Sequence, residues 1–88
     1  MYVIRAMVRG EGEDDFKTRY ASTLFYGDRS TWYENPVCAM TFKEQGEARK
    51  YFTMNKERLL KNREYSVALD TIEICRVDYV PAERINVL

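Results

Sequence analysis

Histidine is absent from this chain of 88 residues, and cysteine and proline occur only twice each. Without histidine there is no Ser-His-Asp or Cys-His catalytic arrangement, no histidine-bearing metal site and no ordinary general base for neutral pH. The two cysteines, Cys38 and Cys75, cannot by themselves form a four-ligand zinc site. We therefore expect a protein with no catalytic residue, no metal site and no cofactor.

Long apolar runs are also missing. No window approaches the roughly 18–20 apolar residues that span a bilayer. Arg5 and Arg9 interrupt the opening segment MYVIRAMVRG, which argues against a signal peptide. We therefore expect a cytoplasmic protein that does not enter a membrane, with its thiols reduced. Cys38, in the apolar run PVCAM, is expected in the core.

Neither sign of charge is in excess, because 14 basic side chains balance 14 acidic ones. Proteins that bind phosphate backbones usually carry a positive excess, since charge neutralisation supplies most of their non-specific affinity. Nucleic acid is therefore a less favoured partner than protein. Apolar residues make up 45% and charged residues 32% of the chain, as in globular proteins, so its length predicts one domain with a thin core.

Strand patterns open and close the chain. Residues 2–9 alternate, with Val3 as the exception, which predicts a half-buried strand whose outer face carries Arg5 and Met7. Residues 20–26 and 31–33 flank the turn sequence GDRS and predict a hairpin. A short apolar strand is expected within 37–42. The last strand, 67–80, is apolar on both faces, which indicates either burial on both sides or a bulge at the Ile74–Cys75 step.

A single amphipathic helix is predicted between these strands. Thr41 and Glu44 fit a capping box, so the helix is expected to begin near Lys43 and to end near Asn62. Its apolar stripe consists of Ala48, Tyr51, Phe52 and Leu59. The predicted fold is α+β, with a three- to four-stranded, mostly antiparallel sheet and this helix on one face. Residues 1–80 form the domain and 81–88 a tail.

Aromatic residues supply the candidate binding surface on the other face of the sheet. They make up 14% of the chain, with seven tyrosines and one tryptophan, the residue types most enriched at protein interfaces. We expect Trp32 to be the energetic hot spot. The partner-binding candidates are Tyr26, Arg29, Trp32 and Tyr33 on the hairpin and open sheet face, with Glu13, Asp14 and Asp15 in the loop before it.

The acidic loop has more than one interpretation. Four carboxylates lie within residues 11–15. Such a cluster can hold Ca²⁺ or Mg²⁺, but it lacks the spacing of an EF-hand. It can also imitate a row of phosphates for a basic groove of a partner, or form a solvated turn, which is the commonest role of such runs.

A third of the chain resembles a family of small accessory proteins from tailed phages and prophages. The resemblance rests on Trp32, the step AMTF at 39–42 and the run ARKY at 48–51. In those proteins an aromatic hairpin leads through an A-x-x-F step to a helix whose early alanine packs on the sheet. Some of them bind and redirect or inhibit a host protein. The resemblance covers residues 31–60 and transfers no functional residue.

The leading hypothesis is thus a non-catalytic protein-binding module, a phage-derived modulator or inhibitor of a cellular protein. The alternative is a small nucleic-acid-binding protein that uses the sheet tyrosines and the basic end of the helix around Lys56, Arg58 and Lys61. A small enzyme, which would need carboxylate or metal chemistry, is the third. A homodimer is compatible with each, because a bare strand edge invites pairing.

Overall fold

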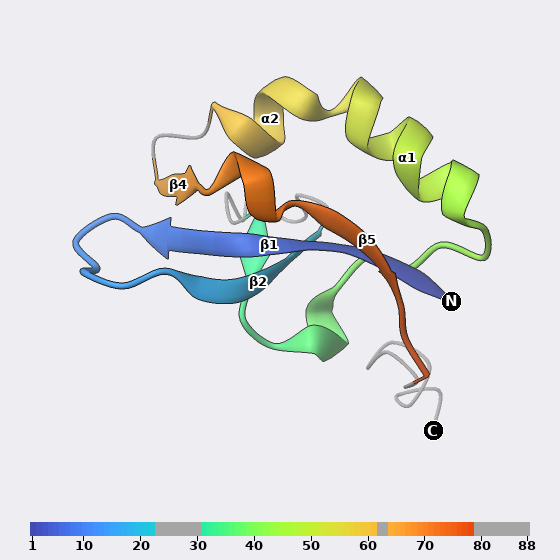
Figure 1. Cartoon of the computed structure of the whole chain (residues 1–88), viewed down its shortest axis with the longest axis horizontal. Coiled ribbons are helices and arrows are strands. Elements are labelled where there is room, and N and C mark those ends of the chain that lie inside the picture. Colours follow the sequence, from blue (N-terminus) through green and yellow to red (C-terminus); the bar gives the residue numbers. More distant parts are fainter. Residues whose placement is uncertain (23–30, 62–63, 79–88) are drawn as a thin grey trace.

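A five-stranded, mostly antiparallel sheet with helices on one side forms the α+β fold of this chain (Figure 1). The computed structural model describes residues 1–22, 31–61 and 64–78. The predicted fold class is confirmed, although the sheet has five strands and the predicted tail at 81–88 lies outside the described residues. The elements are β1 (Tyr2–Gly10), β2 (Lys17–Ala21), β3 (Trp32–Tyr33), η1 (Pro36–Cys38), α1 (Gln45–Met54), α2 (Lys56–Leu60), β4 (Tyr65–Val67), η2 (Leu69–Thr71) and β5 (Glu73–Arg76).

Strand β1 is the centre of the sheet. One edge pairs with β2, whose other edge pairs with β3, and the opposite edge pairs with both β4 and β5. The predicted alternation of β1 is confirmed, because Ile4, Ala6 and Val8 belong to the buried core. The predicted hairpin is confirmed where it is described, with Ala21 opposite Trp32 and Tyr20 opposite Tyr33. Its turn lies outside the described residues.

The helical region covers the core side of the sheet in two parts. Its predicted stripe is confirmed, since Ala48 and Leu59 are fully buried and Tyr51 and Phe52 pack against the core. The predicted start was early: Glu44 is the N-cap, and its N–H donates to Glu47 Oε1 at 3.2 Å.

Asn55 separates α1 from α2, because its φ of −114° leaves the helical region. Its side-chain nitrogen donates to Tyr51 O at 2.9 Å, so the side-chain amide caps a backbone carbonyl in the last turn of α1. The single continuous helix predicted from the sequence is therefore divided at Asn55.

Residues 37–42 do not form the predicted strand. Asn35 and Pro36 start the short turn η1, in which Asn35 Oδ1 accepts the N–H of Val37 at 3.1 Å. The segment contacts the sheet at two points: Phe42 forms an isolated bridge to Tyr2, and the N–H of Met40 donates to Ala21 O of β2 at 3.0 Å. Cys38 is consequently exposed rather than in the core, which corrects the expectation from its apolar neighbours.

The predicted strand at 67–80 is interrupted by η2. Val8 lies opposite Val67 and Ile4 opposite Ile74, so β1 advances four residues while its partner advances seven. The interruption lies before β5, not at the predicted Ile74–Cys75 step. Thr71 closes the resulting gap in the ladder: its Oγ1 accepts the N–H of Met7 at 2.9 Å and donates to Ala68 O at 2.6 Å.

Replacement of Thr71 by valine is expected to lower the free energy of unfolding by about 1–3 kcal/mol, because the Met7 N–H would lose its acceptor in a partly buried site. Urea denaturation would measure the change. Thr53→Val is the matched control: the Thr53 hydroxyl donates to Arg49 O on the exposed helix surface, and we expect its loss to change stability by less than about 0.5 kcal/mol. Equal losses for the two variants would contradict the bridging role of Thr71.

Candidate protein-binding surface

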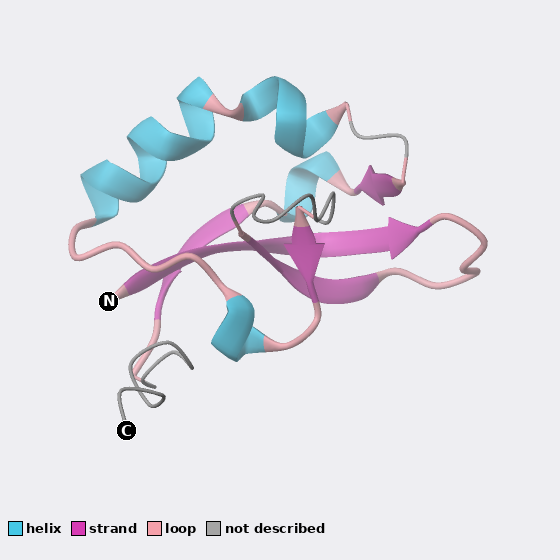
Figure 2. Ribbon diagram, turned by 180° about the vertical axis from the view of Figure 1, so that it is seen from behind, coloured by secondary structure: helices cyan, strands magenta, loops and turns pink. Residues whose placement is uncertain are grey.

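The helices α1 and α2 lie on one side of the sheet (Figure 2). A row of four polar and aromatic side chains crosses the sheet on its other face. Residues directly opposite each other in antiparallel strands point to the same face. Tyr33 lies opposite Tyr20, and Tyr20 lies opposite Arg5. Arg5 in turn lies opposite Glu73. We call this side of the sheet the open face; it carries Arg5, Met7, Arg9, Phe16, Thr18, Tyr20, Tyr33 and Glu73.

Arg5 and Glu73 form an ion pair at one end of this row. Their side chains are 41% and 50% exposed, so the pair is accessible to solvent and to a partner. The hydrogen bond to Glu73 raises the pKa of Arg5, and burial opposes this only in part. The row therefore presents one balanced charge pair beside two tyrosines.

The rest of the open face is less polar. The Thr18 hydroxyl donates to Met7 Sδ at 3.4 Å, and the Arg9 guanidinium lies 5.2 Å from the centre of the Phe16 ring. Phe16 is 41% exposed, which makes it one of the large apolar side chains accessible in the described part. A hollow of about 460 Å³ adjoins this surface, lined by Arg5, Met7, Thr18, Glu73 and, from η2, Asp70 and Thr71.

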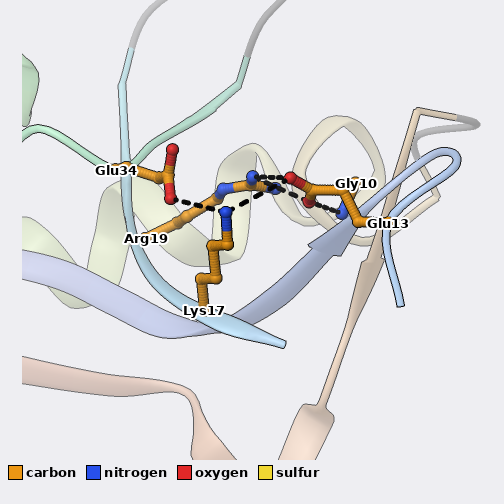
Figure 3. A network of polar contacts seen from close by, with 5 residues as sticks. All are labelled: Gly10, Glu13, Lys17, Arg19 and Glu34. Atoms are coloured by element: carbon orange, nitrogen blue, oxygen red, sulfur yellow. Dashed lines mark hydrogen bonds and ion pairs between the residues drawn. The ribbon is translucent and has the colours of Figure 1, made fainter. Parts of the chain in front are cut away.

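A second polar cluster holds the turn between β1 and β2 (Figure 3). Glu13 Oε1 accepts the N–H of Gly10 at 2.6 Å, and both carboxylate oxygens accept hydrogen bonds from Arg19 Nη2, at 2.8 and 3.0 Å. Lys17 lies 3.7 Å from Glu13 and 3.4 Å from Glu34. We call these five residues the turn cluster. The Gly10 hydrogen bond, reinforced by the positive charges of Arg19 and Lys17, lowers the pKa of Glu13.

Arg19 is a buried cation on the helix side of the sheet. It is only 6% exposed, and its guanidinium lies 5.3 Å from the centre of the Tyr65 ring. Within the described residues, its Nη1 atom has no hydrogen-bond partner. Gly10 makes the cluster sterically feasible, because a Cβ there would lie 2.7 Å from Glu13 Oε1 and 3.2 Å from Arg19 Nη1.

The predicted binding residues are not all brought together. Tyr33 lies on the open face, as expected, but Trp32 points to the opposite side and is 2% exposed in the core. The placement of Trp32 at the open face is therefore wrong, since neighbouring strand residues face opposite sides. Tyr26 and Arg29 lie outside the described residues.

The three predicted acidic residues also divide. Asp14 and Asp15 are exposed, whereas the carboxylate of Glu13 turns inward to Arg19 and the Gly10 backbone. Glu13 is thus committed to an internal ion pair, whereas Glu11, Asp14 and Asp15 are exposed at the turn. In residues 1–22, 31–61 and 64–78, no three carboxylate, cysteine or histidine side chains are grouped to hold a metal ion.

Tyr20 and Glu73 are the surface residues that the sequence interpretation missed. Tyr20 could have been found by extending the hairpin alternation from Tyr33, because the two residues are direct cross-strand neighbours. Glu73 could not have been found that way. Its position opposite Arg5 depends on the three residues that loop out before β5.

Comparison of the chain with protein-family models, curated proteins and solved structures gave no match. Of the helices in the described part, neither is long and apolar enough to cross a membrane. The surface geometry is therefore the basis for assigning a function.

Proposed function

We propose that this chain is a non-catalytic protein-binding module that modulates or inhibits a cellular protein and contacts it through the open face. The observation that carries the proposal is the row Tyr33, Tyr20, Arg5 and Glu73, which crosses four strands on the side without α1 and α2. Tyrosine, methionine and arginine are enriched at protein interfaces, and all three types meet on this face. The resemblance to phage accessory proteins that bind host proteins is in keeping with such a role.

The charge of the open face favours protein over nucleic acid. A phosphate backbone requires several unpaired cations. Of the two arginines on this face, Arg5 is paired with Glu73, and Arg9, which lies over the Phe16 ring, is the one without an ion pair among the described residues. The two features of the nucleic-acid alternative also lie on different sides of the molecule. Tyr20 and Tyr33 are on the open face, whereas α2 with its cations covers the other face (Figure 2). One bound strand lying along a single face would therefore meet only one of them.

Arg58, one of the cations of α2, is engaged in contacts within the molecule. Its Nη2 donates to Ser22 O at 3.2 Å and to the hydroxyl of Tyr51. The side chain thus ties α2 to the end of β2 and to α1, which is a structural use of a residue that the alternative assigns to phosphate binding.

Variants of the open face test this proposal. The tagged 88-residue chain would be used to capture partners from a cell lysate with and without nuclease treatment, and the captured protein would be titrated with the Tyr20→Thr and Arg5→Glu variants. Truncation of an interface hot spot costs about 2 kcal/mol or more, so we expect affinity to fall by roughly thirtyfold. The control is Met54→Ala, which alters a side chain that is 73% exposed on α1.

The two results that would contradict the proposal are distinct. Capture that depends on nuclease-sensitive material, with a steep dependence on salt, would indicate nucleic-acid binding. A captured protein that binds the folded Tyr20→Thr and Arg5→Glu variants as tightly as the wild type would place the interface elsewhere.

A further inference from the structure

The outer edge of β5 has backbone groups that the sheet does not use. The N–H of Val77 donates to Met1 O at 2.8 Å, in the same register that places Tyr2 opposite Arg76. Because hydrogen-bonded and non-hydrogen-bonded pairs alternate in an antiparallel ladder, Ile74 and Arg76 direct their N–H and C=O groups away from β1. In the described ranges, no hydrogen bond reaches these groups from the outer side. Figure 1 shows β5 in front of β1, on the viewer's side of the sheet.

An apolar hollow opens beside the same edge, between β5 and α1. It has a volume of about 250 Å³, and its apolar walls are Ile4, Phe52, Ile72 and Ile74, with Gln45, Arg49 and Glu73 as its polar members. Ile72, Ile74 and Phe52 pack against the core but remain half-buried. The core is therefore incompletely covered at this edge, and a side chain entering from outside would meet apolar atoms.

The charge at this edge is positive. Arg76 is two residues from Ile74 in β5 and so points to the helix side, where it is exposed; Arg49 of α1 is exposed as well. Among the described residues, neither arginine forms an ion pair, whereas the one acidic residue of β5, Glu73, is paired with Arg5 on the open face. Asp78, just beyond β5, is exposed too, so the two arginines leave this edge with one positive charge in excess. A carboxylate on the helix side of an added strand would meet these two guanidinium groups.

We propose that the β5 edge binds an extended, acidic and apolar segment of another protein by strand addition. In this mode main-chain hydrogen bonds supply affinity, and pockets for alternate side chains supply specificity. The added strand would bond to the backbone of Ile74 and Arg76, place an apolar side chain in the hollow, and place a carboxylate near Arg49 or Arg76. The site is separate from the open face and does not depend on the function proposed for it.

Charge also distinguishes such a segment from a second copy of this chain. Two β5 edges related by a twofold axis would bring two Arg76 and two Arg49 side chains to the same side of a continuous sheet. Like charges in that arrangement are unfavourable, while a carboxylate-bearing strand compensates the existing pair. The edge therefore suits an acidic segment of a different protein better than it suits itself.

A displayed library of random nine-residue peptides, selected on the immobilised full-length protein, tests this inference. We expect the enriched peptides to alternate apolar residues with other residues and to contain Asp or Glu. The synthesised consensus peptide should bind Arg76→Pro about tenfold more weakly than it binds Arg76→Ala, because proline removes the outward N–H. Arg76→Ala is the matched control, since it removes the charge but keeps that donor. A variant that combines Arg49→Glu and Arg76→Glu should instead enrich peptides with Lys or Arg.

Four results would overturn the proposal. Three concern the peptides: selection without an alternating acidic consensus, a consensus that binds Arg76→Pro as tightly as Arg76→Ala, and an unchanged consensus on the charge-reversed variant. A dimer seen by light scattering that Arg76→Pro abolishes would assign the edge to a second copy, and would overturn it too. Circular dichroism would verify that each variant is folded. Tyr20→Thr, on the open face, should leave peptide binding at β5 unchanged. A failure of the open-face proposal can therefore be told apart from a failure of the β5 proposal.

Discussion

Replacement of Trp32 by alanine is expected to lower the free energy of unfolding by about 3–5 kcal/mol. Trp32 is 2% exposed and is one of the largest fully buried side chains, in a core cluster with Ala21, Ala48 and Leu59. Its indole Nε1 also donates to Leu59 O at 2.9 Å in a buried site, which joins β3 to the end of α2. A small domain has only a few kcal/mol of stability to lose, so much of the variant protein would be unfolded at room temperature.

Urea denaturation followed by circular dichroism would measure this loss. Trp32→Phe keeps an aromatic ring but leaves the Leu59 carbonyl without its donor, so we expect a smaller loss of about 1–3 kcal/mol. Met54→Ala, at a side chain that is 73% exposed, should change stability by less than about 0.5 kcal/mol. A Trp32→Ala protein that kept its stability but lost partner binding would restore the interface role and contradict the core assignment.

The contrast between Trp32 and Tyr33 shows what sequence patterns can and cannot determine. Composition and turn signals were sufficient to predict an extended aromatic segment here. They did not determine which of the two neighbouring residues faces the core, because that depends on the register between β3 and β2. In β1 the alternation of buried and partly exposed residues runs from Ile4 to Arg9, with Val3 as the exception before it, and the core face follows directly, whereas β3 has only two residues.

Register also limited what could be predicted at the end of the chain. The segment after Tyr65 has the composition of a continuous strand, but β4 and β5 pair with the same edge of β1 in two registers. The interruption depends on the Thr71 hydroxyl, which replaces a main-chain partner of Met7. A side chain acting as part of the ladder has no periodic signal in sequence, and therefore the position of Glu73 on the open face could not be anticipated.

The acidic turn is a third case, in which residue type was informative and orientation was not. Glu13, Asp14 and Asp15 are consecutive carboxylates, yet only Glu13 is placed to accept both the Gly10 N–H and the Arg19 guanidinium. Arg19 could not be identified as a partner because a buried arginine is exceptional in a strand of this size. The cluster explains how the turn is held while Asp14 and Asp15 stay exposed.

Removal of Glu13 is expected to destabilise the protein more than removal of its buried partner. Glu13→Ala leaves the guanidinium of Arg19 buried without a counter-ion, whereas Arg19→Met replaces it by an apolar side chain that suits the core side of the sheet. We expect the melting temperature of Glu13→Ala to lie at least about 10 °C below that of Arg19→Met. The double variant should recover most of this difference. Equal melting temperatures for the two single variants would contradict the account of Arg19 as a buried charge that requires Glu13.

The same ion pair predicts a loss of stability in acid. Because the pKa of Glu13 is lowered in the folded protein, the unfolded chain takes up a proton more readily than the folded one. The contribution of Glu13 to stability is therefore fully present above its ordinary pKa of 4.5 and is lost as the pH falls below that value through the folded-state pKa. Denaturation of the wild type at a series of pH values should show this decline, and the combined Glu13→Gln and Arg19→Met variant should show a shallower one. Parallel declines in the two proteins would mean that other carboxylates dominate acid unfolding and that Glu13 titrates alike in both states.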